Sequence, residues 1–194
     1  MEVVVVAWPS GPLESAALRR AGITARALGH EVTEIDLLAE GFAAAMTTEE
    51  RAAYHEDEPV VGDVIARHVA IVRQAEALIF VYPTMASTLP PPLRGWLERV
   101  MLPGVAFVFD PETERVKPGL TRVGRILGIA TYPETWPVVK AQHDNGRRIL
   151  LRALRLNTGF RTRTRWVPCY SAPAADEIER NKFLARVEGA VASL

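Results

Sequence analysis

Short apolar runs alternate with amphipathic segments along most of the chain. The first apolar run is rich in β-branched residues and is closed by proline, which is typical of a strand buried on both faces. It predicts a strand at Glu2–Trp8, and Glu31–Asp36 alternates like a strand with one face covered. Three later stretches predict further strands, at Ala77–Tyr82, Arg125–Thr131 and Arg161–Tyr170. Proline at position 168 favours an edge position for the last of them.

The segments between these strands carry apolar residues at helical spacing. In residues 13–28 they share one face, and Gly29 follows as a C-cap. Thr47 and Glu50 predict a capping box for a short helix through Tyr54. Further helices are predicted from Val61, from Pro91, over Gly146–Asn157 and from Pro173. The turn signals in Asp110–Pro118 and the prolines in Tyr132–Asn145 predict loops.

Strands that alternate with helices predict one α/β domain over residues 1–194, with a parallel sheet and helices on both faces. The length and the alternation fit the strand order 2-1-3-4-5, whose switch point lies between the first and third strands. Ligands of such sheets bind at the loops beyond the carboxyl ends of the strands. The candidate site therefore consists of the loops Trp8–Leu13, Pro83–Thr88 and Thr131–Trp136.

Composition and charge exclude several classes of protein. Of the 194 residues, 48% are hydrophobic and 24% are charged, which excludes a disordered chain. The formal net charge is zero, so no global field attracts nucleic acid or an anionic membrane. The first apolar run is too short for a signal peptide or a membrane span, and the single cysteine, Cys169, excludes an internal disulfide. We expect a cytoplasmic protein with no nucleic-acid partner, no membrane insertion and an inert Cys169.

The sequence predicts no metal site. Residues 55–58, His-Glu-Asp-Glu, are of metal-ligating types, but the other histidines show no ligand spacing around them. We interpret this cluster as a solvated loop.

The strongest match to a known family is VYPTMASTLPPPLRGWLERVMLPGVAF, at residues 81–107. It resembles the strand–proline–loop–helix pattern of the flavodoxin-like NAD(P)H:quinone oxidoreductases, which include the drug-activity-modulator quinone reductases and the ancillary flavoproteins of potassium efflux systems. Shorter matches are Asp36-Leu37, Glu40-Gly41-Phe42, Glu50-Arg51, Tyr54-His55, Lys117-Pro118-Gly119-Leu120 and FLARVEGAV at residues 183–191.

The resemblance covers nearly the whole chain. It implies a flavodoxin-like fold with FMN or FAD at the switch point. NAD(P)H would pass hydride to the flavin, which would pass it to a quinone or a similar small-molecule acceptor. The resemblance also implies a homodimer in which the other subunit borders each pocket.

All three predicted cofactor loops depart from the family's pattern. In the first, Trp8-Pro9 replaces His-Pro, and Glu14 lies near the Ser-Phe pair that holds the flavin phosphate in the family. Ser10 and Ser15 still offer hydroxyl groups at a helix start. The negative charge of Glu14 is compatible with a bound phosphate only if the side chain points to solvent. Trp8 either lines the pocket or packs against the first helix.

The second and third loops have lost an aromatic pair and a glycine. Pro83 and Thr84 are followed by Met85-Ala86, where the family has aromatic residues against the flavin ring. Residues 130–133, Ala-Thr-Tyr-Pro, replace a glycine-containing motif, and Thr131-Tyr132 would contact the edge of the flavin or simply turn the chain. Three changes at one site indicate a remodelled pocket.

The resemblance also suggests residues that act on substrate. Trp136 lies where the family carries a substrate-facing aromatic residue, and Tyr132 and His143 are the candidate catalytic groups. The alternative for His143 is a solvated loop histidine.

Arginines recur at positions 147, 148, 152, 155, 161, 163 and 165. This Arg147–Arg165 region is either a site for a phosphate or an acidic partner, or, as we favour, a solvated helix face and a charged edge strand. Trp96 is expected in the core or in a dimer interface.

Two functions remain open at this level. The first is an NAD(P)H-dependent flavin oxidoreductase acting on quinones or another electrophile. The second is a flavin-free relative with a remodelled pocket, acting as a non-redox enzyme or as a binding or regulatory subunit.

Overall fold

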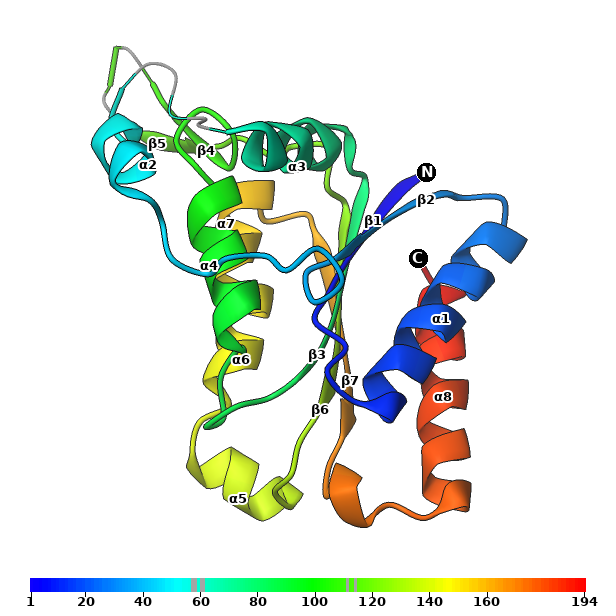
Figure 1. Ribbon diagram of the computed structural model, residues 1–194. Coiled ribbons are helices and arrows are strands. Elements are labelled where there is room, and N and C mark those ends of the chain that lie inside the picture. The colour runs from blue at the N-terminus through cyan, green and yellow to red at the C-terminus, as the bar shows by residue number, and fades with distance from the viewer. Residues whose placement is uncertain (57–58, 60–61, 111, 114) are drawn as a thin grey trace.

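The computed structural model describes residues 1–56, 59, 62–110, 112, 113 and 115–194 (Figure 1). Its central sheet has five parallel strands in the order β2-β1-β3-β6-β7. The strands are β1 (Glu2–Ala7), β2 (Glu31–Asp36), β3 (Ala77–Pro83), β6 (Arg125–Thr131) and β7 (Arg163–Cys169). This confirms the predicted order 2-1-3-4-5, because β6 and β7 are the fourth and fifth strands of the sheet, and β7 is at an edge.

The strand register places the predicted loops at one end of the sheet. Thr131, the last residue of β6, pairs with Pro83 of β3 and with Cys169 of β7. Ala7, the last residue of β1, pairs with Val81. The chain segments that leave β1, β3 and β6 therefore start side by side, as the parallel sheet requires.

Helices cover both faces of the sheet (Figure 1). One face carries α1 (Pro12–Ala27) and α8 (Glu177–Val191), and the other carries α3 (Asp63–Gln74), α4 (Pro91–Val100) and the segment from α6 to α7. A hydrophobic cluster lies under each layer, because the central strands are apolar at successive positions. Val5 and Ile79 face α1 and α8, whereas Phe80 faces the other layer and packs edge-on against Trp96. Trp96 is fully buried within this subunit, as one of the two alternatives for it predicted.

The helix predicted over Gly146–Asn157 contains a change of helical type. It consists of α6 (Asn145–Arg148), a π-helical turn, η1 (Ile149–Ala153), and α7 (Leu154–Thr158). A π turn bonds residues five apart instead of four, so it rotates the side chains after it relative to those before it. Such turns are frequent at functional sites.

Two predictions near prolines were wrong in detail. The predicted loop Tyr132–Asn145 contains α5 (Trp136–Ala141), in which Pro137 occupies the first helical turn, where proline is well tolerated. Pro173 does not open the last helix but lies in a short 3₁₀ turn, η2 (Ala172–Ala174). Helix α8 begins after Asp176, which forms a capping box with Glu179.

The predicted polar loop Asp110–Pro118 is part of a small hairpin. Strands β4 (Phe107–Phe109) and β5 (Val116–Pro118) pair antiparallel, apart from the main sheet. Pro111 and Glu114, which follow β4 in the sequence, lie outside the described residues.

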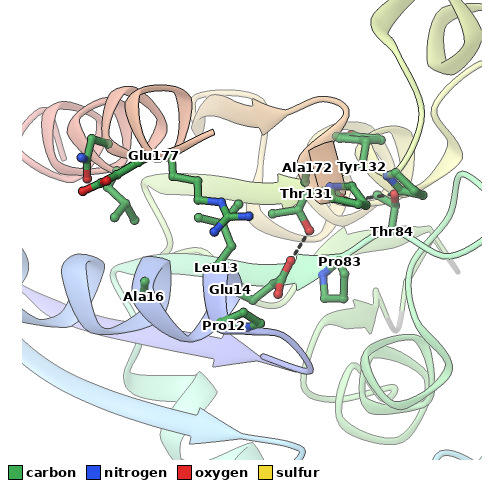
Figure 2. A pocket seen from close by; sticks show the side chains of 15 residues that line it. Pro12, Leu13, Glu14, Ala16, Pro83, Thr84, Thr131, Tyr132, Ala172 and Glu177 are labelled. Carbon is green, nitrogen blue, oxygen red and sulfur yellow. Dashed lines mark hydrogen bonds between the residues drawn. The ribbon is translucent and has the colours of Figure 1, made fainter. Parts of the chain in front are cut away.

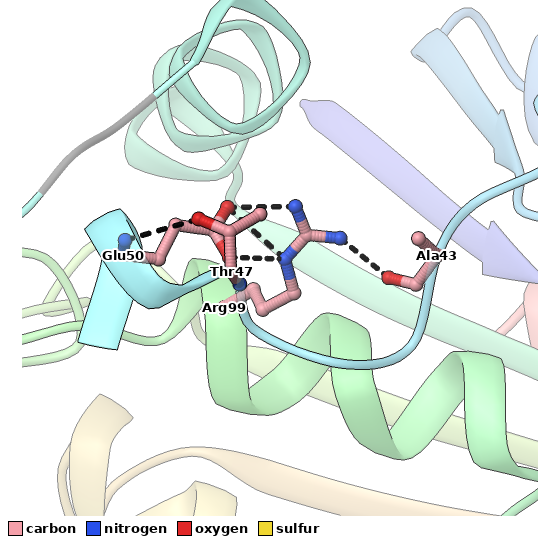
Figure 3. A network of polar contacts seen from close by, with 4 residues as sticks. All are labelled: Ala43, Thr47, Glu50 and Arg99. Carbon is pink, nitrogen blue, oxygen red and sulfur yellow. Dashed lines mark hydrogen bonds and ion pairs between the residues drawn. The ribbon is translucent and has the colours of Figure 1, made fainter.

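The predicted capping box is confirmed and has a second role (Figure 3). Helix α2 (Thr48–Ala53) is capped by Thr47, and its Glu50 also accepts from Arg99 of α4 at 2.6–3.1 Å. The guanidinium of Arg99 donates further to the carbonyl of Ala43. Both ionic side chains are nearly buried, so their bidentate pair fastens this excursion of the chain to α4.

In the described part of the chain, no helix has both the length and the apolar character needed to cross a membrane.

Candidate functional site

A cavity of about 520 Å³ lies between α1 and α8 at the carboxyl ends of β3 and β6 (Figure 2). Its wall includes Pro12, Leu13 and Glu14 of α1, Pro83 and Thr84 after β3, and Thr131 to Pro133 after β6. Helix α8 and the turn before it complete the wall. The cavity thus adjoins the predicted switch point.

Glu14 dominates the polar chemistry of this cavity. Its side chain is buried, and its Oε1 accepts a hydrogen bond from the hydroxyl of Thr131 (Figure 2). A Cβ atom at Gly11 would collide with the other carboxylate oxygen, which places the carboxylate over the start of α1. Unpaired amides and the helix dipole favour negative charge at a helix start. Glu14 therefore points inward, not to solvent, and its carboxylate lies at the start of α1.

The two serines proposed as phosphate ligands do not line the cavity. The Ser15 hydroxyl donates to the carbonyl of Gly11 at 2.9 Å, and Ser10 is exposed. Trp8 is half-buried against the hydrophobic cluster on the α3 and α4 face, and Pro9 is buried; neither lines the cavity.

Tyr132 lines the cavity, but its hydroxyl is directed elsewhere. Its side chain is fully buried, and its Oη donates to both oxygens of Asp144 at 2.9 and 3.0 Å. Burial, reinforced by the Asp144 charge, raises the pKa of Tyr132 far above its ordinary value. The phenol thus stays protonated, and its hydrogen bonds hold the turn after α5; a catalytic role of Tyr132 stays a prediction.

The loop after β3 forms a tight turn beside the cavity. Pro83 and Thr84 reach the cavity wall, and the Thr84 hydroxyl donates to the carbonyl of Thr131 at 3.1 Å. Met85 and Ala86 do not reach it. Met85 exchanges backbone hydrogen bonds with Thr88, which forces positive φ angles at the two residues between them. Ala86 lines a separate cavity of about 720 Å³.

Trp136 and His143 lie at a third location. They line a cavity of about 410 Å³ together with arginines that follow α5. The ring of Tyr170 also lines this cavity and packs on Tyr132 with 5.0 Å between centroids. Tyr132 lines the first cavity, so this aromatic pair lies between the two cavities, and Trp136 and His143 stand apart from Glu14.

Sequence reasoning missed the contribution of the last helix. Glu177, Arg180, Asn181 and Leu184 of α8 line the first cavity. No strand follows α8, so the handedness rule for crossovers does not assign its face, and only its packing on α1 in the folded protein brings it to this cavity.

Cys169 is buried and free, and burial raises the pKa of its thiol, as expected for an inert cysteine. Asp57 and Glu58 of the predicted solvated cluster lie outside the described residues. Among the residues that are described, no three His, Cys, Asp or Glu side chains come together as metal ligands.

Comparisons with solved structures extend over nearly the full chain. A Streptococcus mutans protein has a TM-score of 0.83 at 18% identity, with both chains covered in full. An NAD(P)H:quinone oxidoreductase from Methanothermobacter marburgensis has a TM-score of 0.80 at 18% identity, with 98% of this chain and 97% of that chain covered. An FMN-dependent NADH-azoreductase from Bacillus anthracis, in complex with FMN, has a TM-score of 0.75 at 13% identity, with 98% of each chain covered. At such identities the likeness concerns the fold.

A search of the curated proteins found no match. A family model described as flavodoxin-like fold matches residues 3–157. Because this match spans most of the 194 residues, the chain belongs to the flavodoxin-like family that its sequence resembles.

Proposed function

We propose that this protein is a flavin-dependent oxidoreductase that passes hydride from NAD(P)H to a quinone or a similar electrophilic small molecule. Family membership and the structural neighbours named as quinone oxidoreductase and FMN-dependent azoreductase support this reaction class. The observation that carries the proposal is a cavity beside the switch point, walled by the start of α1 and by the residues after β3 and β6.

The donors at this position suit an anion. The carboxylate of Glu14 acts as a stand-in for a phosphate, since it lies over the start of α1 and accepts from Thr131. A flavin phosphate fits the same donors once the Glu14 side chain turns out of the cavity, which a long side chain in the first helical turn can do by rotamer change. The residues present therefore fit the group with one rearrangement.

Each part of the wall would have its own role toward a bound flavin. Thr131 and the start of α1 would hold the phosphate, and Pro83 and Thr84 would bound the cavity on the side of β3. Leu13 and Leu184 supply apolar surface that excludes water. Bound flavin supplies the chemistry of accepting and donating hydride, while the protein supplies position.

A second candidate is a flavin-free member of the family that binds another small molecule. The buried Glu14–Thr131 hydrogen bond favours it, because the carboxylate and a phosphate repel each other and cannot share one position. This candidate would use the same cavity without redox chemistry.

The two candidates differ in one titration. Purified protein is titrated with FMN and with FAD while flavin fluorescence is followed, and NAD(P)H oxidation is then measured with a quinone. Quenching with turnover supports the reductase. Absence of binding of either flavin at tens of micromolar overturns it and leaves the flavin-free candidate.

A homodimer is part of the proposal. The hairpin β4–β5 presents Phe109 and Val116, each 60% exposed and paired in register, as an apolar surface. A second subunit seated on it would remove this surface from water.

A further inference from the structure

Basic side chains gather around two adjoining cavities of about 410 and 390 Å³, between α5 and the α6–η1–α7 segment. Both cavities are lined by His143, Asp144, Arg147, Arg148 and Arg152, which we call the arginine pocket. Lys140 borders the first cavity and Arg155 the second. The reductase chemistry proposed above leaves these cations without a role.

The helical segment explains how the arginines converge. Arg147 and Arg148 end α6, and Arg152 lies in the π turn that follows. The wider turn changes the direction in which Arg152 projects, and all three side chains border the same two cavities. The chain enters this segment through His143 and Asp144, both with positive φ (67° and 43°), a backbone strain of the kind found at functional sites.

The positive charge of the arginine pocket is balanced by few acidic side chains. Asp144 is its single acid, and both carboxylate oxygens accept from the Tyr132 hydroxyl while one also accepts from the Arg147 amide. Within the described residues, the ion pairs of the protein involve none of the pocket's arginines and not Lys140. Arg155 donates to the carbonyl of Phe160. A cluster of guanidinium groups without carboxylate partners is suited to a multiply charged anion, above all a phosphate.

An aromatic surface lies beside the charge. Trp136 is 53% exposed at the cavity of about 410 Å³, and the Lys140 ammonium lies 4.9 Å from its ring centroid. Tyr170 lines the same cavity. An indole face next to a phosphate site matches a ligand that carries a flat ring close to its phosphate.

We propose that the arginine pocket binds a phosphomonoester on a nucleotide, with the base on Trp136. This inference rests on the proposed function for its biological ligand, which is the adenosine 2′-phosphate of NADPH. The ring of Tyr170, which lines the arginine pocket, packs on the ring of Tyr132, which lines the cavity between α1 and α8 that we propose for the flavin. The preferred reductant is then NADPH and not NADH.

The test is calorimetric titration of the purified protein with NADP⁺ and with NAD⁺, which differ in the 2′-phosphate alone. We expect NADP⁺ to bind at least about tenfold more tightly, and its advantage to shrink as salt is added. The double variant Arg148→Gln/Arg152→Gln should lose the advantage. Arg161→Gln, at an exposed arginine outside both cavities, is the matched control and should retain it.

Equal affinity for the two nucleotides in the unaltered protein would overturn the inference. An NADP⁺ advantage that survives in the double variant would also overturn it. Binding of inorganic pyrophosphate by the arginines without any preference for NADP⁺ would overturn it as well. The flavin titration is read separately. NADP⁺ preference without flavin binding supports the arginine pocket and overturns the reductase. Flavin binding and turnover without that preference support the reductase and overturn the arginine pocket.

Discussion

The hydroxyl of Thr131 donates a hydrogen bond to the carboxylate of Glu14, 117 residues away in sequence. The contact joins the first turn of α1 to the last residue of β6, at the wall of the cavity beside the switch point. It shows that this position accepts a negative charge and that the chain supplies one itself. Under the proposed function, affinity for a flavin phosphate would depend on how readily the Glu14 side chain leaves this position.

Replacing Glu14 with glutamine should strengthen flavin binding. Two unit charges about 4 Å apart repel by roughly 4 kcal/mol at an effective dielectric constant of about 20, and part of this repulsion opposes a phosphate in the present protein. We expect the dissociation constant for FMN to fall at least about tenfold in Glu14→Gln. Fluorescence quenching of FMN measures it.

Glu177→Gln is the matched control, because Glu177 lines the same cavity from α8 but is exposed. It should leave the dissociation constant within about twofold. An unchanged affinity in Glu14→Gln would show that the start of α1 does not hold the phosphate.

Tyr132→Phe should destabilise the protein. The substitution keeps the ring but removes the hydroxyl that donates to Asp144, and a hydrogen bond to a charged group contributes about 1.5–3 kcal/mol. Urea denaturation should show a loss in this range. Tyr170→Phe serves for comparison, since that side chain is half-buried, and it should shift the free energy of unfolding by less than about 0.5 kcal/mol.

Ala86→Gly should stabilise the protein. Ala86 has a φ of 46° in the tight turn between Met85 and Thr88, where glycine avoids the strain of a side chain. The relief exceeds the added entropy of the unfolded chain, and we expect a gain of roughly 0.5–1 kcal/mol. Thermal and urea unfolding measure the gain. Ala86→Val should act in the opposite direction, and a loss of stability in the glycine variant would contradict the strain argument.

His68 should make the protein less stable in mild acid. Its ring is buried, its Nδ1 accepts from the Trp96 indole at 3.3 Å, and its Nε2 lies 3.0 Å from Glu40. Burial lowers the pKa of His68, while the Glu40 charge opposes and the Arg67 and Arg99 charges reinforce the shift. In the pH range just below the ordinary value of 6.5, the unfolded state binds the proton more readily than the folded state.

Stability that is present above pH 6.5 should therefore fall as the pH is lowered through this range. Urea unfolding at several pH values measures the slope, and His68→Gln should flatten it. Asp110 does not contribute to this slope, because hydrogen bonds from Lys117 and from Thr113 hold the pKa of its carboxyl at about 2, below this pH range. A slope that persists in His68→Gln would assign it to other groups.

Phe109→Lys should dissociate the proposed homodimer. Phe109 and its register partner Val116 form the exposed apolar surface of the hairpin β4–β5. We expect an interface above about 2,000 Å², as in obligate dimers, and a dissociation constant at least about tenfold higher in the variant. Light scattering at micromolar concentration reports the mass. Phe160→Lys, at an 81% exposed site elsewhere, should stay dimeric, and a monomeric unaltered protein would contradict the proposal.

The five strands and the main helices could be predicted because their signals are local, and the strand order followed from the length of the chain and the alternation of strands with helices. The continuous valines of β1 and the apolar run of β3 are buried on both faces, and each such run is long enough to specify a strand by itself. The capping box of Thr47 and Glu50 was likewise readable, since its two hydrogen bonds lie within one helical turn.

The sequence alone therefore determined the family, the fold and the three loops around the switch point. What tertiary structure decided is the direction of side chains within those loops. Glu14 turns inward because the hydroxyl of Thr131, distant in sequence, donates a hydrogen bond to it, and the Tyr132 hydroxyl turns away because it donates a hydrogen bond to Asp144. Likewise, the arginines converge because a π turn interrupts their helix, and neither propensity nor spacing encodes that turn. Such choices depend on partners that folding brings together from distant positions, so no window of sequence contains them.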